Sequence, residues 1–209
     1  FVSCDDCIEK WIENDKMEKL ADLWKSICPE RFVNTNIDHA EFPKGVYLAA
    51  KKTFLASECS QSMFLIGKTG SAKTRVGLLL LKRSLLAGKS ISVLWPENLP
   101  KLSTSYNSDT FDRFASYQVL LVDDALMTAC RDAKQTEHLK QLIDVRMRHM
   151  KTTIFTSQVG QEAFKDGKQY GELDSADLER VDAIMRRLRE ECQIVNFAEP
   201  TVSKFEEQF

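Results

Sequence analysis

A short apolar run followed by a glycine-containing loop constrains the fold of this chain more than any other stretch. Residues 63–74 read MFLIGKTGSAKT, which matches the phosphate-binding pattern G-x-x-x-x-G-K-[ST] except that Ala72 replaces the second glycine. In such a loop a buried strand ends, a helix begins, and backbone N–H groups surround phosphate oxygens. The expected nucleotide-binding residues are Gly67, Lys68, Thr69, Gly70, Ser71, Ala72, Lys73, Thr74 and Arg75. The stretch therefore predicts a site for a nucleoside triphosphate, with ATP and ADP as ligands.

A second apolar run ends in two carboxylates. Residues 119–124 read VLLVDD, which predicts a central strand with Asp123 and Asp124 at its C-terminal end. Open α/β sheets bind ligands at that edge. We expect Lys73 to contact the terminal phosphates, and Thr74 and Asp123 to hold Mg²⁺. Asp124 is placed to activate a water molecule for hydrolysis.

Two further groups of polar residues are candidates for contact with the nucleotide. Gln158 follows the expected strand at residues 152–157, so its amide would orient water or contact the γ-phosphate. The alternative for Gln158 is a loop amide that bonds to backbone. Arg186, Arg187 and Arg189 lie on an expected helix and point in different directions. One of these arginines would reach the phosphate of a neighbouring subunit, or all of them form a solvated charged face.

Ala72 is the departure that most affects the prediction. Glycine at this position lets the backbone approach phosphate closely and adopt torsions that are costly to other residues. An alanine costs on the order of 1 kcal/mol there, which would weaken nucleotide binding rather than abolish it. The alternative is a degenerate loop that binds nucleotide poorly and serves as a scaffold.

The composition is that of a globular protein whose net charge gives no strong overall electrostatic field. Its residues are 43% hydrophobic and 29% charged, and the formal net charge is -2. No apolar run approaches the roughly 20 residues that span a membrane, so we expect a cytoplasmic protein with no membrane partner. Contact with single-stranded DNA would depend on local basic residues. The candidates are Lys101 and Arg113 in one segment, and Lys140, Arg146, Arg148 and Lys151 in another.

The cysteines favour reduced thiols over a disulfide framework, because all six are scattered along a chain that does not read as secreted. Cys4 and Cys7 have the C-x-x-C spacing of half a zinc site. The sequence contains no second pair of this kind, so Zn²⁺ binding would need ligands from a segment upstream. The alternative is two ordinary thiols near a terminus.

Strand and helix patterns alternate along the chain. We expect strands at residues 63–66, 90–95, 118–122, 152–157 and 192–197, and helices at 8–27, 46–57, 74–87, 137–150 and 176–191. Residues 31–44 read as loop, and residues 97–116 as polar and irregular with a short helix near 111–114. The apolar residues of the first helix are expected to pack on the following domain, although they would also suit a partner. This alternation predicts an α/β fold with a parallel sheet covered on both faces.

Four segments occur in the order and approximate spacing of a known family. IGKTGSAKTR, LLVDDA, TTIFTSQ and IMRRLRE resemble the motifs of AAA+ ATPases, in particular DnaC-type helicase loaders and the IstB transposition helper, over about residues 60–197. The resemblance implies a P-loop NTPase of the ASCE class. It further implies a five-stranded parallel sheet in the order 5-1-4-3-2, with a helical lid that is absent or minimal.

The resemblance also implies roles for single residues and for the whole chain. Lys73 and Thr74 would form Walker A, Asp123 and Asp124 Walker B, and Gln158 sensor 1. Arg187 would act in trans as an arginine finger within a ring or helical homo-oligomer. The implied function is ATP hydrolysis by a helicase loader or a DNA-replication or transposition helper, with a replicative helicase or transposase as partner. The implied domains are an N-terminal helical segment (1–57), the ATPase domain (58–199) and a short tail (200–209).

Departures from the family pattern leave a second function open. Asp124 stands where many AAA+ proteins have glutamate, which predicts slow hydrolysis. Asp124 and Ala72 together leave an alternative function, a non-hydrolysing nucleotide-dependent switch or adaptor. Its helix at residues 8–27 would bind a partner. A small-molecule kinase fits less well, because the sequence has no arginine-rich lid segment.

Overall fold

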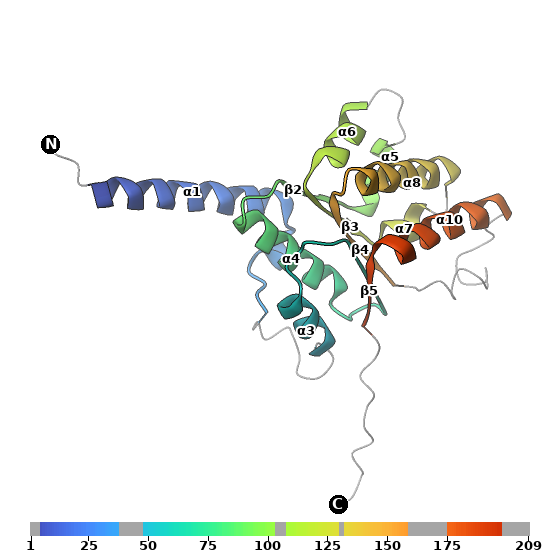
Figure 1. Cartoon of the computed structure of the whole chain (residues 1–209), viewed down its shortest axis with the longest axis horizontal. Coiled ribbons are helices and arrows are strands. Elements are labelled where there is room, and N and C mark those ends of the chain that lie inside the picture. Colours follow the sequence, from blue (N-terminus) through green and yellow to red (C-terminus); the bar gives the residue numbers. More distant parts are fainter. Residues whose placement is uncertain (1–4, 38–47, 103–107, 130–131, 159–174, 198–209) are drawn as a thin grey trace, which may run out of the picture.

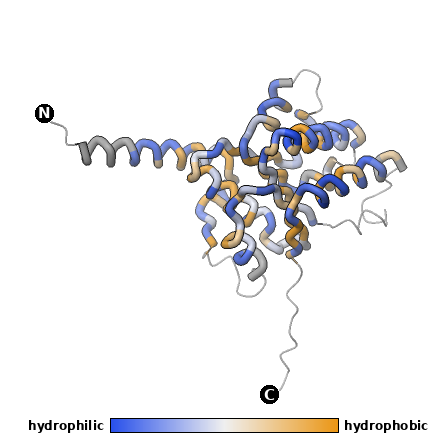
Figure 2. Tube along the Cα trace, in the orientation of Figure 1, coloured by the Kyte–Doolittle hydropathy of each residue, from blue (hydrophilic) through white to orange (hydrophobic). Residues whose placement is uncertain are grey.

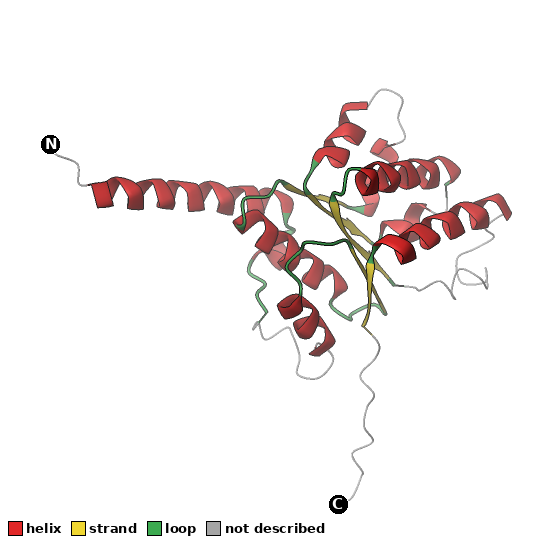
Figure 3. Ribbon diagram, viewed as in Figure 1, coloured by secondary structure: helices red, strands yellow, loops and turns green. Residues whose placement is uncertain are grey.

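Five parallel strands form the centre of the molecule (Figures 1 and 3). This computed structural model of the 209-residue chain describes residues 5–37, 48–102, 108–129, 132–158 and 175–197. The strands are β1 (Met63–Gly67), β2 (Ile91–Leu94), β3 (Val119–Asp123), β4 (Thr152–Ser157) and β5 (Gln193–Phe197). They lie in the order β2-β3-β4-β1-β5. Read from the opposite edge this is 5-1-4-3-2, so the predicted sheet is confirmed.

The C-terminal ends of three strands meet at one edge of the sheet. Ile66 of β1 lies beside Ser157 of β4, and Asp123 of β3 lies beside Thr156 of β4. Because all strands run in the same direction, the segments that follow β1, β3 and β4 emerge together. The candidate residues of the sequence analysis follow these three strands and therefore share this edge.

Helices cover both faces of the sheet, as the sequence predicts. One face carries α1 (Asp5–Ile27), α2 (Glu30–Val33), α3 (Leu48–Ala56) and α4 (Lys73–Leu86), and the other carries α5 (Leu99–Leu102), α6 (Ser108–Ser116), α7 (Ala125–Ala129), α8 (Ala133–Arg148) and α10 (Ser175–Glu191). Successive strand residues serve opposite cores: Phe64 and Phe155 pack under α8 and α10, while Leu65 and Ile154 pack under α4. Hydrophobic residues accordingly gather in the strands and the helix sides that face them (Figure 2).

The segment after β2 is more helical than the sequence analysis predicts. A short 3-10 turn, η1 (Pro96–Asn98), leads into α5, and α6 follows, where a mostly irregular connection was expected. The reason is burial, because Leu99, Leu102 and Phe114 all join the core beneath α8. Helix α8 also begins four residues before the expected start. The Asp132 carboxylate caps it by accepting from the backbone N–H groups of residues 134 and 135, at 2.8 and 3.0 Å.

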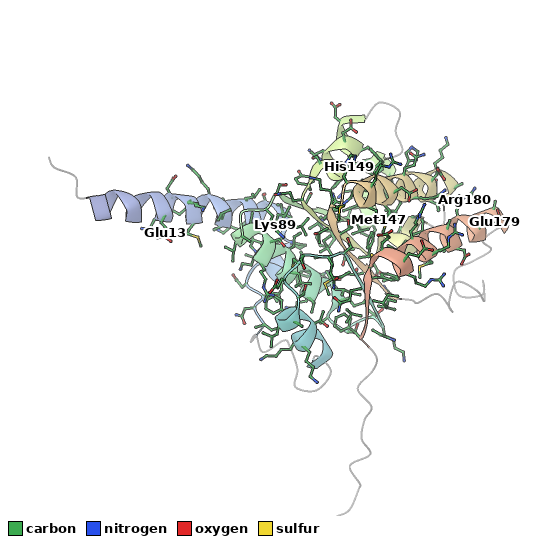
Figure 4. The ribbon with its side chains drawn as sticks, in the orientation of Figure 1. Glu13, Lys89, Met147, His149, Glu179 and Arg180 are labelled. Atoms are coloured by element: carbon green, nitrogen blue, oxygen red, sulfur yellow. The ribbon has the colours of Figure 1, made fainter. Side chains whose placement is uncertain are left out.

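Helix α1 packs on the domain only through its C-terminal part. Trp24 is 5% exposed against α4, whereas Met17 is 49% and Leu23 45% exposed. The rest of α1 extends away from the sheet, and Glu13 on this part points into solvent (Figures 1 and 4). The expected packing is therefore confirmed at Trp24 and wrong at Leu23, while the side chains of Ile8, Trp11 and Ile12 lie outside what the structure describes. In the described parts of the chain, no helix is both long and apolar enough to cross a membrane.

Candidate nucleotide site

The loop between β1 and α4 turns tightly from the end of the strand into the start of the helix. Gly70 and Ala72 both have positive φ, 82° and 66° respectively, and Ala72 lies immediately before the first residue of α4. At Gly67 there is no room for a side chain, because a Cβ would lie 2.8 Å from the Phe197 carbonyl oxygen and 2.8 Å from Ser71 Oγ. The loop thus folds tightly between β5 and α4, and its backbone N–H groups lead into a helix N-terminus.

Lys73 is held inside this loop. Its side chain is buried, and Nζ donates to the carbonyl oxygens of Gly67 at 2.6 Å and Lys68 at 2.9 Å. Burial lowers the pKa of the Lys73 ammonium below its ordinary value, while the carboxylates of Asp124 and Asp123 oppose this shift. Among the described residues the ammonium hydrogen-bonds only to neutral groups, so no carboxylate bonded to it competes with a phosphate oxygen.

Asp123 lies at the end of β3 beneath the loop. It is 8% exposed, and its Oδ1 accepts a hydrogen bond of 2.8 Å from the Thr156 hydroxyl of β4. Burial raises the pKa of the Asp123 carboxyl, and hydrogen bonds with Thr74 and Thr156 oppose this shift. The carboxylate and the neighbouring Thr74 hydroxyl offer the oxygen ligands that Mg²⁺ prefers, so these residues fit the predicted metal role.

Asp124 and Gln158 form a hydrogen-bonded pair above Asp123. The backbone N–H of Gln158 donates to Asp124 Oδ1 at 3.2 Å, and its side-chain Nε2 donates to Oδ2 at 2.6 Å. The Thr69 hydroxyl of the β1–α4 loop donates to Gln158 Oε1 at 2.9 Å. Asp124 itself has a φ of 50°, and its backbone N–H donates to the carbonyl and hydroxyl oxygens of Thr156. The predicted water-activating carboxylate and the predicted sensor are therefore in direct contact.

These residues surround a cavity of about 400 Å³. The lining residues are Arg31, Phe32, Thr69, Gly70, Ala72, Lys73, Thr74, Arg75, Asp124 and Gln158. Of the predicted site residues, Gly67, Lys68, Ser71 and Asp123 are not among the lining residues. The structure thus brings together the predicted loop residues with Asp124 and Gln158.

Arg31 and Phe32 are lining residues that sequence reasoning missed, because residues 31–44 read as loop. Two guanidinium groups lie over the Phe32 ring, with Cζ of Arg31 at 4.5 Å and Cζ of Arg75 at 5.0 Å from the ring centroid. Arg75 also donates to the Thr35 hydroxyl at 2.7 Å. A signal was present in the sequence, since Pro29 stands at the N-cap of this short helix and Glu30 in its first turn, a pattern that favours a helix start.

Arg187 lies far from the cavity of its own chain. Helix α10 runs away from the nucleotide edge and ends at Glu191, just before Gln193 of β5 pairs with Met63, the first residue of β1. On the surface between α8 and α10, Arg187 Nε lies 3.3 Å from Asp144 Oδ1 and Nη1 lies 3.9 Å from Glu190 Oε2. The structure therefore leaves no role for Arg187 at the nucleotide of the same chain.

One predicted DNA contact is wrong. Arg146 is 1% exposed, and its guanidinium donates to backbone oxygens of Phe114, Tyr117 and Thr152 at 2.7–2.8 Å. Burial lowers its pKa to about 10. Arg148, two residues later, is exposed, as are Lys101 and Arg113 beside a second cavity of about 240 Å³ near β2.

The zinc prediction falls outside what the structure describes. Cys4 precedes the described residues, and Cys7 lies in α1 at a position whose side chain is not described. Among the described residues there is no cluster of three or more metal-ligating side chains.

The fold is similar to that of several solved structures. The crystal structure of DnaI is 18% identical, covering 83% of this chain and 93% of its own, with a TM-score of 0.60. The DnaC helicase loader is 17% identical over 80% of this chain and 99% of its own, with a TM-score of 0.56. DnaA bound to AMPPCP and single-stranded DNA is 12% identical over 80% of this chain, with a TM-score of 0.54, and this chain spans 50% of that one.

No protein-family model and no curated protein matches the sequence. The structural matches show that the chain shares the fold of these proteins, and the DnaC helicase loader among them is of the type that the sequence resemblance names.

Proposed function

We propose that this chain binds ATP with Mg²⁺ in the cavity beside the β1–α4 loop and hydrolyses it. The observation that carries this proposal is that Lys73, Thr74, Asp124 and Gln158 come from three strand ends to line one cavity, with Asp123 directly below. A buried ammonium whose described hydrogen-bond partners are all neutral suits the β- and γ-phosphates, and paired oxygen ligands suit the metal ion.

In this proposal each residue has one chemical task. Bound Mg²⁺ would neutralise charge on the phosphates, and Thr74 and Asp123 would hold it. Asp124 would accept the proton of the attacking water, with Gln158 holding the carboxylate in place. Backbone N–H groups of residues 67–75 and the Lys73 ammonium would stabilise the negative charge that develops on the γ-phosphate.

Hydrolysis by this chain would take place between two copies. Arg187 lies at the opposite end of the sheet from the cavity of its own chain, and it is half-exposed on the surface. A second copy, packed with its cavity against α8 and α10, would receive this guanidinium at its γ-phosphate. The assembled form would be a ring or a helical array of like subunits.

The partner that we propose is the machinery of DNA replication or transposition. The solved structures with this fold include a helicase loader and an initiator bound to single-stranded DNA, which supports a loader or helper role. Lys101 and Arg113, exposed beside the cavity near β2, are the basic residues that would contact DNA phosphates. Such contacts would weaken steeply with salt.

A second candidate function is a nucleotide-dependent switch or adaptor that does not hydrolyse ATP. The positive φ of Ala72 favours it, because a methyl group stands where the backbone would approach phosphate. The extension of α1 away from the sheet also favours it, since such a helix is available to a partner.

ATP turnover with and without single-stranded DNA separates these functions. The proteins to compare are the wild type, Lys73→Ala, Arg187→Ala and a mixture of the two variants. We expect turnover in the wild type, loss in each variant, and partial recovery in the mixture, because an intact cavity then meets an intact arginine. Nucleotide binding without turnover under all conditions would favour the switch, and failure of the wild type to bind ATP would reject both functions.

A further inference from the structure

A chain of three side chains connects the phosphate-binding loop to the end of β3. Thr69 donates to Gln158 Oε1, and Gln158 donates to both carboxylate oxygens of Asp124. These residues follow β1, β4 and β3 respectively, so the contacts depend on the sheet order and on no local sequence signal. All three side chains line the nucleotide cavity.

The orientation of the Gln158 amide determines whether its nitrogen or its oxygen faces the Asp124 carboxylate. With Nε2 toward Asp124, the 2.6 Å contact is a charge-assisted hydrogen bond. If the amide were turned by 180°, Oε1 would face the carboxylate and the two acceptors would repel each other. The last side-chain torsion of glutamine is broad and has no strong preference of its own, so contacts must select the orientation.

Thr69 supplies the second of these contacts. Its hydroxyl is the donor that Oε1 requires, and it lies 2.9 Å away in a loop fixed by the tight packing of Gly67 and by Lys73. The carboxylate holds the Nε2 end of the amide and the hydroxyl holds the Oε1 end. With both ends held, the amide keeps one orientation, and Asp124 keeps its position relative to the phosphate-binding loop.

We propose that Thr69 is a positioning residue for ATP hydrolysis, which acts through the Gln158 amide to hold Asp124 ready for the attacking water. This rests on the proposed function, because it assumes that Asp124 accepts a proton from water. Thr69 therefore has a task distinct from that of its neighbours in the loop, which bind phosphate through backbone N–H groups or through Lys73.

The test compares Thr69→Val with Thr69→Ser in the full chain. Valine keeps the branched shape of threonine and removes the hydroxyl, whereas serine keeps the hydroxyl. We expect Thr69→Val to lower kcat roughly fivefold to tenfold with little change in KM or in the affinity for a fluorescent ATP analogue. Thr69→Ser should stay within about twofold of the wild type in kcat. Thr128→Val, at an exposed position of α7, is the matched control and should have no effect.

A double-mutant cycle shows whether Thr69 acts through Gln158. In a Gln158→Ala background the Thr69→Val substitution should cause no further loss of kcat, because the amide that it orients is gone. Additive losses would overturn the proposal. So would a loss confined to KM, which would mean that Thr69 contacts nucleotide directly, or a rise in kcat, which would mean that the contacts restrain Asp124.

The outcomes for the proposed function and for this inference are separate. Turnover in the wild type that is lost in Asp124→Asn but unchanged in Thr69→Val would keep the proposed function and reject the role of Thr69. Absence of turnover in the wild type would reject both.

Discussion

Ala72 combines a side chain with a backbone conformation that favours glycine. Its φ of 66° and ψ of 17° lie in the left-handed region, where the Cβ atom costs about 1–2 kcal/mol. The surrounding loop imposes this conformation, because Lys73 and Gly67 fix the chain on both sides. Strain at such a position is typical of sites where the backbone must face a ligand.

Ala72→Gly should therefore stabilise the protein and strengthen nucleotide binding. Relief of the left-handed strain outweighs the greater freedom of glycine in the unfolded chain, for a net gain of about 0.5–1 kcal/mol in the free energy of unfolding. Denaturant unfolding measures the gain, and titration with ATP measures the affinity. Ala87→Gly is the matched control: Ala87 has a φ of -78°, so the same substitution should bring no gain there. A loss of stability in Ala72→Gly would contradict the inference that the backbone at Ala72 is strained.

Asp123 is a buried carboxylate whose charge opposes folding in the absence of metal. Burial raises its pKa, so above that pKa the folded state bears a cost of ionisation that the unfolded state does not bear. Asp123→Asn should therefore raise the Tm of the nucleotide-free protein at pH 7, by about 2–4 °C, while it abolishes Mg²⁺-dependent turnover.

The pH dependence of this gain has a definite sign. As the pH falls through the raised pKa toward the ordinary value of 3.8, the wild-type carboxyl takes up its proton and the cost disappears. The difference in Tm between Asp123→Asn and the wild type should thus be smaller at pH 4 than at pH 7. Asp112→Asn, at an exposed position of α6, should show no gain at either pH. An equal gain at both pH values would contradict an ionisation cost.

At the scale of elements, the Arg146 side chain links the end of α6, the turn before β3 and the start of β4. Its guanidinium binds carbonyl oxygens at the end of α6 and before β3, the Thr152 carbonyl, and the Thr153 hydroxyl at 2.9 Å. The neighbouring end of α8, with Met147 and His149, is visible in Figure 4. This one buried cation satisfies backbone oxygens that have no other described side-chain donor.

Arg146→Ala should destabilise the domain strongly. It removes the side-chain donor of several buried carbonyl oxygens, for a loss of roughly 3 kcal/mol in the free energy of unfolding. Arg148→Ala, two residues along α8 and exposed, should leave stability within about 0.5 kcal/mol of the wild type. Chemical denaturation of both variants checks this, and equal stability of the two variants would contradict the role given to Arg146.

The elements that sequence predicts best are those whose signal is local. The β1–α4 loop and β3 are readable because a buried strand, a turn and a polar end lie within a dozen residues. Arg146 is not readable, because a helix with basic residues gives the same pattern whether an arginine binds water or a distant carbonyl. The contact of Thr69 with Gln158 spans 89 residues, so only the sheet order reveals it. Helix α5 was missed because two leucines in a polar segment give too short a pattern.

At the scale of the whole molecule, the chain has a sheet domain and a helix that extends from it. The described side chains of α1 before Leu20 are mostly exposed, while Trp24 is buried and its Nε1 donates to the Val33 carbonyl at 3.3 Å. The attachment of α1 thus lies in its last turns, next to α2, whose Arg31 and Phe32 line the nucleotide cavity.

This arrangement predicts that the extended part of α1 is dispensable for the stability of the domain. Removal of residues 1–16 should change neither the Tm nor the affinity for nucleotide, because this part of α1 extends away from the sheet and the side chains described at residues 13–16 are exposed or partly exposed. Trp24→Ala should lower the free energy of unfolding by about 3 kcal/mol, because it opens a cavity between α1 and α4. Thermal unfolding and nucleotide titration of both variants check this. A large fall in Tm on truncation would show that α1 packs along its whole length, and a stable Trp24→Ala variant would show that its last turns are not the attachment.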